Sequence, residues 1–398
     1  MRPTDNRPSQ ARPSIRFVLL TAITTVVILY GSLYPFEFHI PAEGEGALST
    51  LLRSWSTTPG RGDFVANVLL YMPLGWLGIL SLSQRMSVRF RLFVVILGGA
   101  ALSVSMELTQ YFDVGRVTSA DDVYANSAGT ILGSLGATCL SGHWPKPLIP
   151  DISARPIPIA LIAAWIGYRL YPYVPTIDLH KYWSALKPVI LYPTLSLDDL
   201  CRHTTIWLTI FVLTKAIVGK QRSAMIAPLF CGCLLAARVV IIGTVLSIAE
   251  IAGAVIALGL WPILLALPAR RVSAVLFVLL GSVVIFERLQ PFQFQSSARK
   301  FGWLPFRSLM EGSIGVDVMS FFEKSFLYGS LLFLFIEAGC RLRTAATVVC
   351  GVLFATSWAE AYLPGRSAEI TDTVMAMLLA VGIALTNPQP QGGELNSG

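Results

Sequence analysis

Charged side chains are scarce in this sequence. They make up 13% of its 398 residues, whereas hydrophobic residues make up 54%. A typical soluble domain carries about 25% charged residues. The shortage excludes an ordinary soluble enzyme and a disordered chain, and it favours a polytopic membrane protein. We therefore predict an all-α fold, a bundle of membrane-spanning helices.

Cysteine and histidine are also few, with six and four residues. The sequence contains no Cys-x-x-Cys pair, and Cys231 and Cys233 are too close together for a zinc-binding spacing. The histidines are isolated from one another in different predicted loops. We therefore expect no metal site and no cofactor, and we interpret the cysteines as small packing residues.

Apolar runs long enough to cross a bilayer as helices occur twelve times. They cover residues 16–34, 64–82, 91–109, 124–140, 156–171, 204–219, 224–242, 245–267, 272–287, 321–337, 344–360 and 370–386. The first run follows an arginine-rich start and has no small-x-small cleavage site behind it. We therefore expect it to remain as a helix rather than to be removed as a signal peptide.

The basic residues predict the orientation. If the N-terminus lies in the cytoplasm, the two tails and the five loops on the cytoplasmic side hold 16 Lys and Arg but four acids. The remainder of the chain holds 14 Lys and Arg and 19 acids. Basic residues of short loops stay on the cytoplasmic side, so both termini are predicted to be cytoplasmic. The net charge of +7 is then a sum over two faces, and it does not indicate a nucleic-acid partner.

Recurring landmarks predict internal repeats. An aromatic-proline step closes the first, fifth and ninth runs, and an aspartate follows it after 28, 27 and 26 residues. The prolines are Pro35, Pro172 and Pro291, and the aspartates are Asp63, Asp199 and Asp317. We predict three parallel four-helix repeats at 1–142, 143–268 and 269–390, with a disordered tail at 391–398.

The first repeat holds the densest set of polar residues. The candidate binding residues are Asp63, Asn67, Glu107, Gln110, Arg116, Asp122 and Asn126. We expect Glu107, Arg116 and Asp122 to form an ion-paired cluster at the outer ends of their helices, because an unpaired charge there is costly. Asp121 or Asp122 is predicted to cap the helix of run 124–140.

The other two repeats vary this pattern. The second-copy candidates in the third repeat are Glu360, Arg366 and Asp372, and the spacing from Arg366 to Asp372 equals that from Arg116 to Asp122. The middle repeat has Arg238 and Glu250 instead, which we predict to form a charge-reversed pair with a scaffold role.

The run ELTQYFDVGRVTSADDVYANSAG, with DFVANVLLYMPLG upstream, resembles the VanZ-like family. The matching positions are Asp63, Asn67, Pro73, Gly75, Glu107, Gln110, Arg116, Asp122, Asn126 and Gly129. The segment around Arg366 resembles the same pattern a second time, although Met375 and Ala376 stand where an asparagine is expected. The resemblance implies a bacterial plasma-membrane protein with a role in the cell envelope, in a family associated with resistance to the glycopeptide teicoplanin.

The polar clusters have several interpretations. They fix the register of neighbouring helices, or they bind a polar headgroup at the outer membrane face. In the second case the partners are membrane lipids or lipid-linked cell-wall or polysaccharide precursors. A membrane enzyme acting on such a precursor and a transporter or flippase remain alternatives. We favour binding over catalysis, because no nucleophile–base pair is visible and the polar groups gather at one face.

Overall fold

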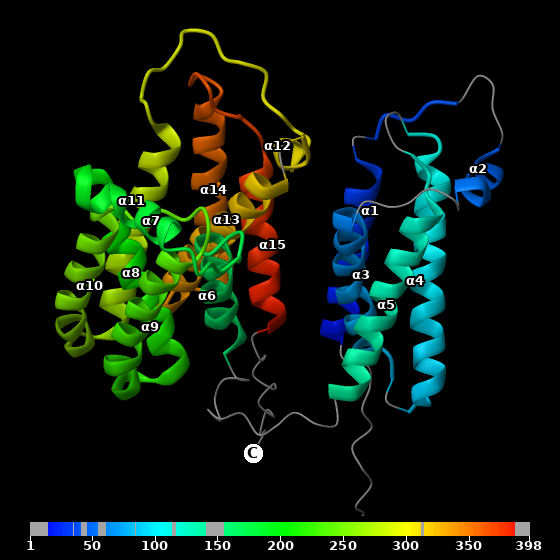
Figure 1. Ribbon diagram of the computed structural model, residues 1–398, viewed down its shortest axis with the longest axis horizontal. Coiled ribbons are helices and arrows are strands. Elements are labelled where there is room, and N and C mark those ends of the chain that lie inside the picture. The colour runs from blue at the N-terminus through cyan, green and yellow to red at the C-terminus, as the bar shows by residue number, and fades with distance from the viewer. Residues whose placement is uncertain are drawn as a thin grey trace, which may run out of the picture. The chain divides into compact units, whose positions relative to one another are not determined.

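The computed structural model describes residues 15–34, 36–40, 46–54, 61–83, 85–113, 117–140, 155–311 and 314–386. These residues form helices and no strand, which confirms the all-α fold. The helices are α1 (Ile15–Leu33), α2 (Ala47–Arg53), α3 (Arg61–Ser81), α4 (Val88–Gln110), α5 (Ala120–Leu140), α6 (Pro156–Arg169), α7 (Leu179–Leu191), α8 (Leu197–Val218), α9 (Lys220–Val240), α10 (Ile248–Ala266), α11 (Ala269–Leu289), α12 (Arg307–Glu311), α13 (Ile314–Glu337), α14 (Leu342–Glu360) and α15 (Thr371–Thr386) (Figure 1).

Twelve of these helices lie at the twelve predicted apolar runs. The other three, α2, α7 and α12, each follow the first long helix of a predicted repeat. Seven helices are long and apolar enough to cross a membrane: α3, α4, α9, α10, α11, α13 and α14. Three further apolar segments are shorter, at Phe17–Leu33, Pro156–Arg169 and Thr371–Thr386. The number of twelve crossings therefore stays a prediction.

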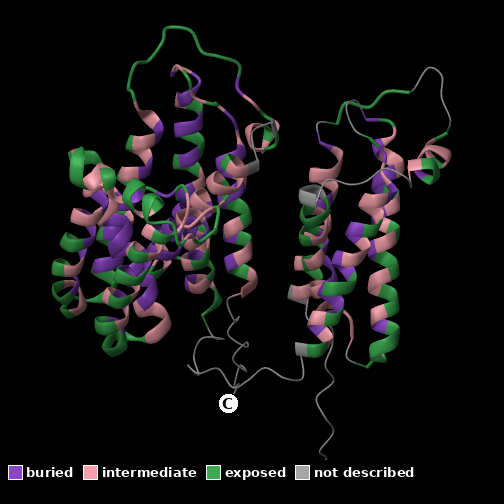
Figure 2. Ribbon diagram, viewed as in Figure 1, coloured by how far each residue is buried: buried purple, intermediate pink, exposed green. Residues whose placement is uncertain are grey.

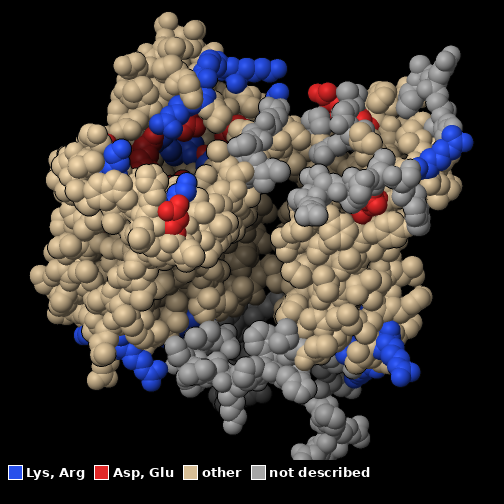
Figure 3. All heavy atoms as spheres, in the orientation of Figure 1, with Lys and Arg blue, Asp and Glu red and all other residues tan. Residues whose placement is uncertain are grey.

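The chain divides into two compact units, Met1–Lys146 and Pro147–Gly398. We call them the N-terminal and the C-terminal unit. In each unit the charged side chains gather toward the two ends of the helices on the face that Figure 3 shows, and the surface between them is uncharged. This distribution suits helices whose middle parts lie in lipid, where a charge is costly.

The N-terminal unit is a bundle of α1, α3, α4 and α5, in which α3 packs closely on α5. A Cβ atom added to Gly129 would overlap the carbonyl oxygen of Val68, and one added to Gly133 would overlap that of Met72. Only a residue without a side chain lets two helix backbones approach so closely. Gly129 and Gly133 form a Gly-x-x-x-Gly pattern, and this spacing puts both on the face of α5 that packs on α3.

The C-terminal unit is built around α8 and α13. Ten consecutive residues are buried in each helix, 205–214 in α8 and 325–334 in α13. A helix that is buried on all sides lies in the core of a bundle, and Figure 2 shows the buried positions inside this unit. The packing is reciprocal, because α6 of the second predicted repeat packs on α13, and α11 of the third packs on α8.

The aromatic-proline steps share a backbone conformation. Phe36, Tyr173 and Phe292 have φ angles of 66°, 63° and 60°. Each of them donates its N–H to the carbonyl three residues earlier, at 2.7–2.8 Å. This left-handed conformation is uncommon for residues other than glycine, and it recurs after the proline in each of the three predicted repeats. The boundaries at 142/143 and 268/269 stay a prediction, and the tail at 391–398 lies outside the described residues.

Candidate functional site

The predicted polar residues of the N-terminal unit connect its helices. Glu107, at the end of α4, is 3% exposed and accepts a hydrogen bond from the backbone N–H of Ser119 at 2.8 Å. Asn67 of α3 donates to Oδ1 of Asp122 in α5, also at 2.8 Å. The two bonds join α4 to the start of α5 and α3 to α5.

Two further predicted residues make similar links. Gln110 donates to the carbonyl of Ser32 in α1 at 2.7 Å, and Asn126 donates to the hydroxyl of Ser103 in α4 at 2.9 Å. Arg116 and the side chain of Asp63 lie outside the described residues, so the cluster of Glu107, Arg116 and Asp122 stays a prediction. The described contacts all hold one helix or helix end against another.

The prediction that Asp121 or Asp122 caps the helix of run 124–140 is wrong. Helix α5 begins at Ala120, so Asp121 and Asp122 lie inside its first turn. The apolar run that predicted the boundary begins after these acids, because hydropathy marks the lipid-facing part of a helix and not its polar first turn. Acids at this place still stabilise the helix through its dipole.

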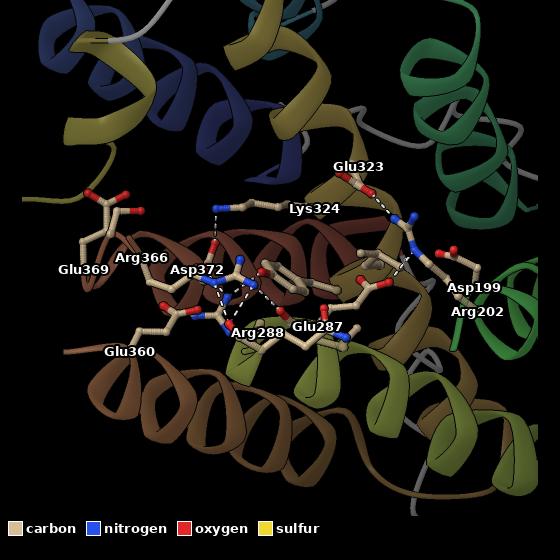
Figure 4. Close-up of a pocket in the computed structure, with 15 residues that line it drawn as sticks. Asp199, Arg202, Glu287, Arg288, Glu323, Lys324, Glu360, Arg366, Glu369 and Asp372 are labelled. Carbon is tan, nitrogen blue, oxygen red and sulfur yellow. Dashed lines mark hydrogen bonds and ion pairs between the residues drawn. The ribbon is translucent and has the colours of Figure 1, made fainter. Parts of the chain in front are cut away.

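The third predicted repeat holds a buried ion-pair cluster, which we call the Arg288 cluster (Figure 4). Arg288, near the end of α11, pairs with Asp372 and with Glu360, the latter at 3.0 Å. It also donates to the hydroxyls of Ser357 at 2.8 Å and Tyr328 at 3.0 Å. Its charge and its donors are thereby shared among α13, α14 and α15.

Lys324 extends this cluster, with its Nζ 2.7 Å from Oδ1 of Asp372. A second set of ion pairs lies beside it. Arg202 of α8 pairs with Glu287 of α11 and with Glu323 of α13, the latter at 2.6 Å. Arg202 therefore links the second predicted repeat to the third.

A cavity of about 460 Å³ separates these ion pairs. Four basic and six acidic side chains line it: Arg202, Arg288, Lys324, Arg366, Asp199, Glu287, Glu323, Glu360, Glu369 and Asp372. All three second-copy candidates predicted from the sequence are among them. Acids exceed bases by two, so the cavity suits a ligand that brings positive charge or hydroxyl groups. In the part of the chain that the structure describes, no group of three His, Cys, Asp or Glu side chains is placed to hold a metal ion.

The middle repeat holds a second ion-pair cluster, the Glu250 cluster. Glu250, at the start of α10, pairs with Arg238 of α9 and with Arg169 of α6. The predicted pair of Arg238 and Glu250 is confirmed, and Arg169 is an addition to it. The space beside this cluster measures about 10 Å³, which holds no more than a water molecule.

The prediction missed Arg288, Arg169, Arg202, Glu287 and Glu323 as cluster members. The sequence contains a pattern that identifies two of them, because Arg169 and Arg288 each lie three residues before the proline of an aromatic-proline step. The other three make their contacts between helices far apart in the chain, and sequence spacing does not report such contacts.

The apolar helices and the charges at their ends define the class of the protein, a helical membrane protein. Residues 7–141 match the family model VanZ/LLP1. The N-terminal part of the chain is therefore a VanZ-like domain, and the chain that contains it is a helical membrane protein. The match ends at residue 141, so the repeats after it stay a prediction. No curated protein and no solved structure matches the chain.

Proposed function

We propose that the C-terminal unit binds the polar headgroup of a membrane lipid or of a lipid-linked envelope precursor. The binding site is the cavity between the Arg288 cluster and Arg202. Its volume of about 460 Å³ falls within the range of about 300–1,000 Å³ typical of ligand pockets. Its lining of ten charged side chains suits a headgroup and not an acyl chain.

The contrast with the Glu250 cluster carries this proposal. Ion pairs that serve only to fix helices need no space beside them, and the Glu250 cluster has almost none. The Arg288 cluster combines the buried ion pairs of Arg288 with a cavity large enough for a small molecule. Polar side chains held in place around such a cavity fix the orientation of a bound ligand.

The position along the helices supports a site at the outer membrane face. The charged lining residues come from the last turn of α11 and α14, from the α14–α15 connection, from the first two turns of α8, from the first turn of α15, and from the N-terminal half of α13. With both termini in the cytoplasm, all of these parts face outward. A headgroup at the outer leaflet of a bacterial plasma membrane would enter the cavity without crossing the bilayer.

The transporter alternative receives less support. Glu250 lies inside the predicted run 245–267. A carrier site near the bilayer midplane needs a polar group that is able to bind cargo. Glu250 is 2% exposed and is held by two arginines. Both of its carboxylate oxygens are already used in these ion pairs, so it has no free oxygen for cargo.

Filling the cavity tests the proposal. Ser367 is an exposed residue at the cavity wall, and Ser367→Trp adds bulk while leaving every ion pair described above intact. We expect the wild-type protein, extracted in mild detergent, to carry an enriched lipid in native mass spectrometry. The variant should carry it at less than one tenth of the wild-type level.

The matched control is Ser297→Trp, which places the same side chain on an exposed loop position of the same unit. It should retain the lipid. Equal lipid occupancy in the wild type and in Ser367→Trp would refute the headgroup site. A link to teicoplanin rests on the family association, and a comparison of teicoplanin susceptibility with and without Ser367→Trp tests it separately.

A further inference from the structure

A second cavity, of about 280 Å³, adjoins the first. The two share Arg366, Ser367 and Glu369 in their walls. The second cavity adds three basic residues, Arg299, Lys300 and Arg307. It therefore differs from its neighbour in charge, because four bases face a single acid.

The acid is already engaged. Ser308 donates to the carboxylate of Glu369 through its hydroxyl and, at 3.3 Å, through its backbone N–H. Two of the bases, Arg299 and Arg366, have partners of another kind. Within the described ranges, neither Arg299 nor Arg366 has a carboxylate within 4 Å, and both donate to backbone carbonyls.

These carbonyl contacts fix the two guanidinium groups in place. Arg366 donates to the carbonyls of Glu287 at 2.7 Å and Gln290 at 3.1 Å. Arg299 donates to the carbonyl of Glu360 at the end of α14 and to those of Leu363 and Arg366 in the α14–α15 connection. A guanidinium held by neutral acceptors keeps its full charge and pays little entropy when it binds an anion.

The loop that carries Arg299 and Lys300 is itself pinned. Its backbone N–H groups at Gln295, Arg299 and Gly302 donate to carbonyls of the α14–α15 connection at 2.8 Å, and Gly302 accepts from Ile370 at 3.0 Å. The basic side chains therefore project from a backbone that is ordered before any ligand arrives.

An exposed tryptophan indicates where this loop lies relative to the lipid headgroups. Trp303 is 62% exposed, whereas the neighbouring Phe301 packs against Phe354 and Trp358 of α14. Exposed tryptophan is enriched at the level of the lipid headgroups. A basic cavity at this level faces the phosphates of the membrane surface.

We propose that this cavity is an anion subsite that binds the phosphate of a lipid, while the rest of the headgroup occupies the acid-rich cavity beside it. The inference rests on the proposed function in one respect, namely that the neighbouring cavity takes the headgroup. Arginine suits phosphate because its charge and its N–H donors both interact with phosphate oxygens. The carbonyl contacts use Nη2 of Arg299 and Nε and Nη2 of Arg366, so the other N–H groups of each guanidinium are the donors for the phosphate. The ligand class is thereby narrowed to phosphate-bearing lipids.

A binding experiment with three probes tests the subsite. Delipidated protein in detergent is titrated with short-chain phosphatidic acid, with diacylglycerol of the same chain length, and with inorganic phosphate. We expect phosphatidic acid to bind at least tenfold more tightly than either of the other two. Inorganic phosphate binding as tightly as phosphatidic acid would overturn the lipid assignment, and diacylglycerol doing so would overturn the phosphate subsite.

Charge variants locate the subsite. Lys300→Glu should weaken binding of phosphatidic acid at least tenfold, and Lys300→Gln should weaken it less. Lys181→Glu makes the same charge change at an exposed position of α7 outside the cavity, and it should leave the affinity unchanged. Equal affinity in the wild type and in both Lys300 variants would overturn the inference. If Ser367→Trp loses the native lipid while the Lys300 variants bind normally, the anion subsite is refuted and the proposed headgroup site is retained.

Discussion

The Glu250 cluster and the Arg288 cluster occupy corresponding places in two predicted repeats, and they differ in charge. Each has an arginine three residues before the proline step, and in each the residues at the end of the third helix and the start of the fourth are twelve apart. In one, two arginines surround one acid. In the other, two acids surround one arginine.

The difference also appears in the space around the clusters. The Glu250 cluster is closed, with about 10 Å³ beside it, and the Arg288 cluster borders about 460 Å³. A closed ion pair contributes to the arrangement of the helices. An ion pair at a cavity wall holds side chains in place for a ligand. The same backbone position therefore serves as scaffold in one repeat and as a proposed binding site in the other.

The largest effect is expected from Glu250→Ala. It leaves Arg169 and Arg238 buried without their carboxylate, and losing one partner of a buried ion pair costs about 3–5 kcal/mol. Equilibrium unfolding in mixed detergent and SDS micelles measures the change. The triple replacement of Arg169, Arg238 and Glu250 by methionine should recover most of the loss, because it removes the charges together. A triple variant as unstable as Glu250→Ala would contradict the scaffold role.

An intermediate effect is expected from Asp372→Asn. Arg288 keeps Glu360, Ser357 and Tyr328 as partners, and Lys324 is partly exposed. We expect a loss of about 1–3 kcal/mol, the range for weakening one charged hydrogen-bond contact. The same unfolding experiment measures it. A loss equal to that of Glu250→Ala would mean that the open cavity does nothing to relieve the remaining charges.

The smallest effect is expected from Glu360→Gln. The glutamine oxygen still accepts from Arg288, and Asp372 still compensates the charge, so the loss should stay below about 1 kcal/mol. The matched variant in the other cluster is Arg238→Gln, which leaves Glu250 with one arginine and should cost more. The comparison fails if unfolding shows the two glutamine variants to be equally stable.

Much of the fold was predictable because it depends on local patterns. Apolar runs marked twelve of the helices, since a lipid-facing segment must be apolar along its whole length. Gly129 and Gly133 indicated the close packing of α5, because their spacing puts both on one helix face. Equal spacing likewise marked Arg366 and Asp372. The pair of Arg238 and Glu250 was predicted from its opposite charges at the corresponding place in the middle repeat.

The cavity was not predictable in this way. Arg202 and Glu323 are 121 residues apart, and Arg288 lies 84 residues before Asp372. No periodicity connects such pairs. Arg366 was predicted as a second-copy candidate from its spacing to Asp372. Its hydrogen bonds to backbone carbonyls depend on how α11 ends beside the α14–α15 connection.

The scarcity and placement of charge by themselves determined that this is a helical membrane protein and which helix ends carry its polar residues. Only the tertiary structure decided which of those charges neutralise one another and where space remains between them. The physical reason is that burial forces charges to pair. Which partner each one takes depends on the packing of α8 and α13 against α6 and α11, and not on distance along the chain.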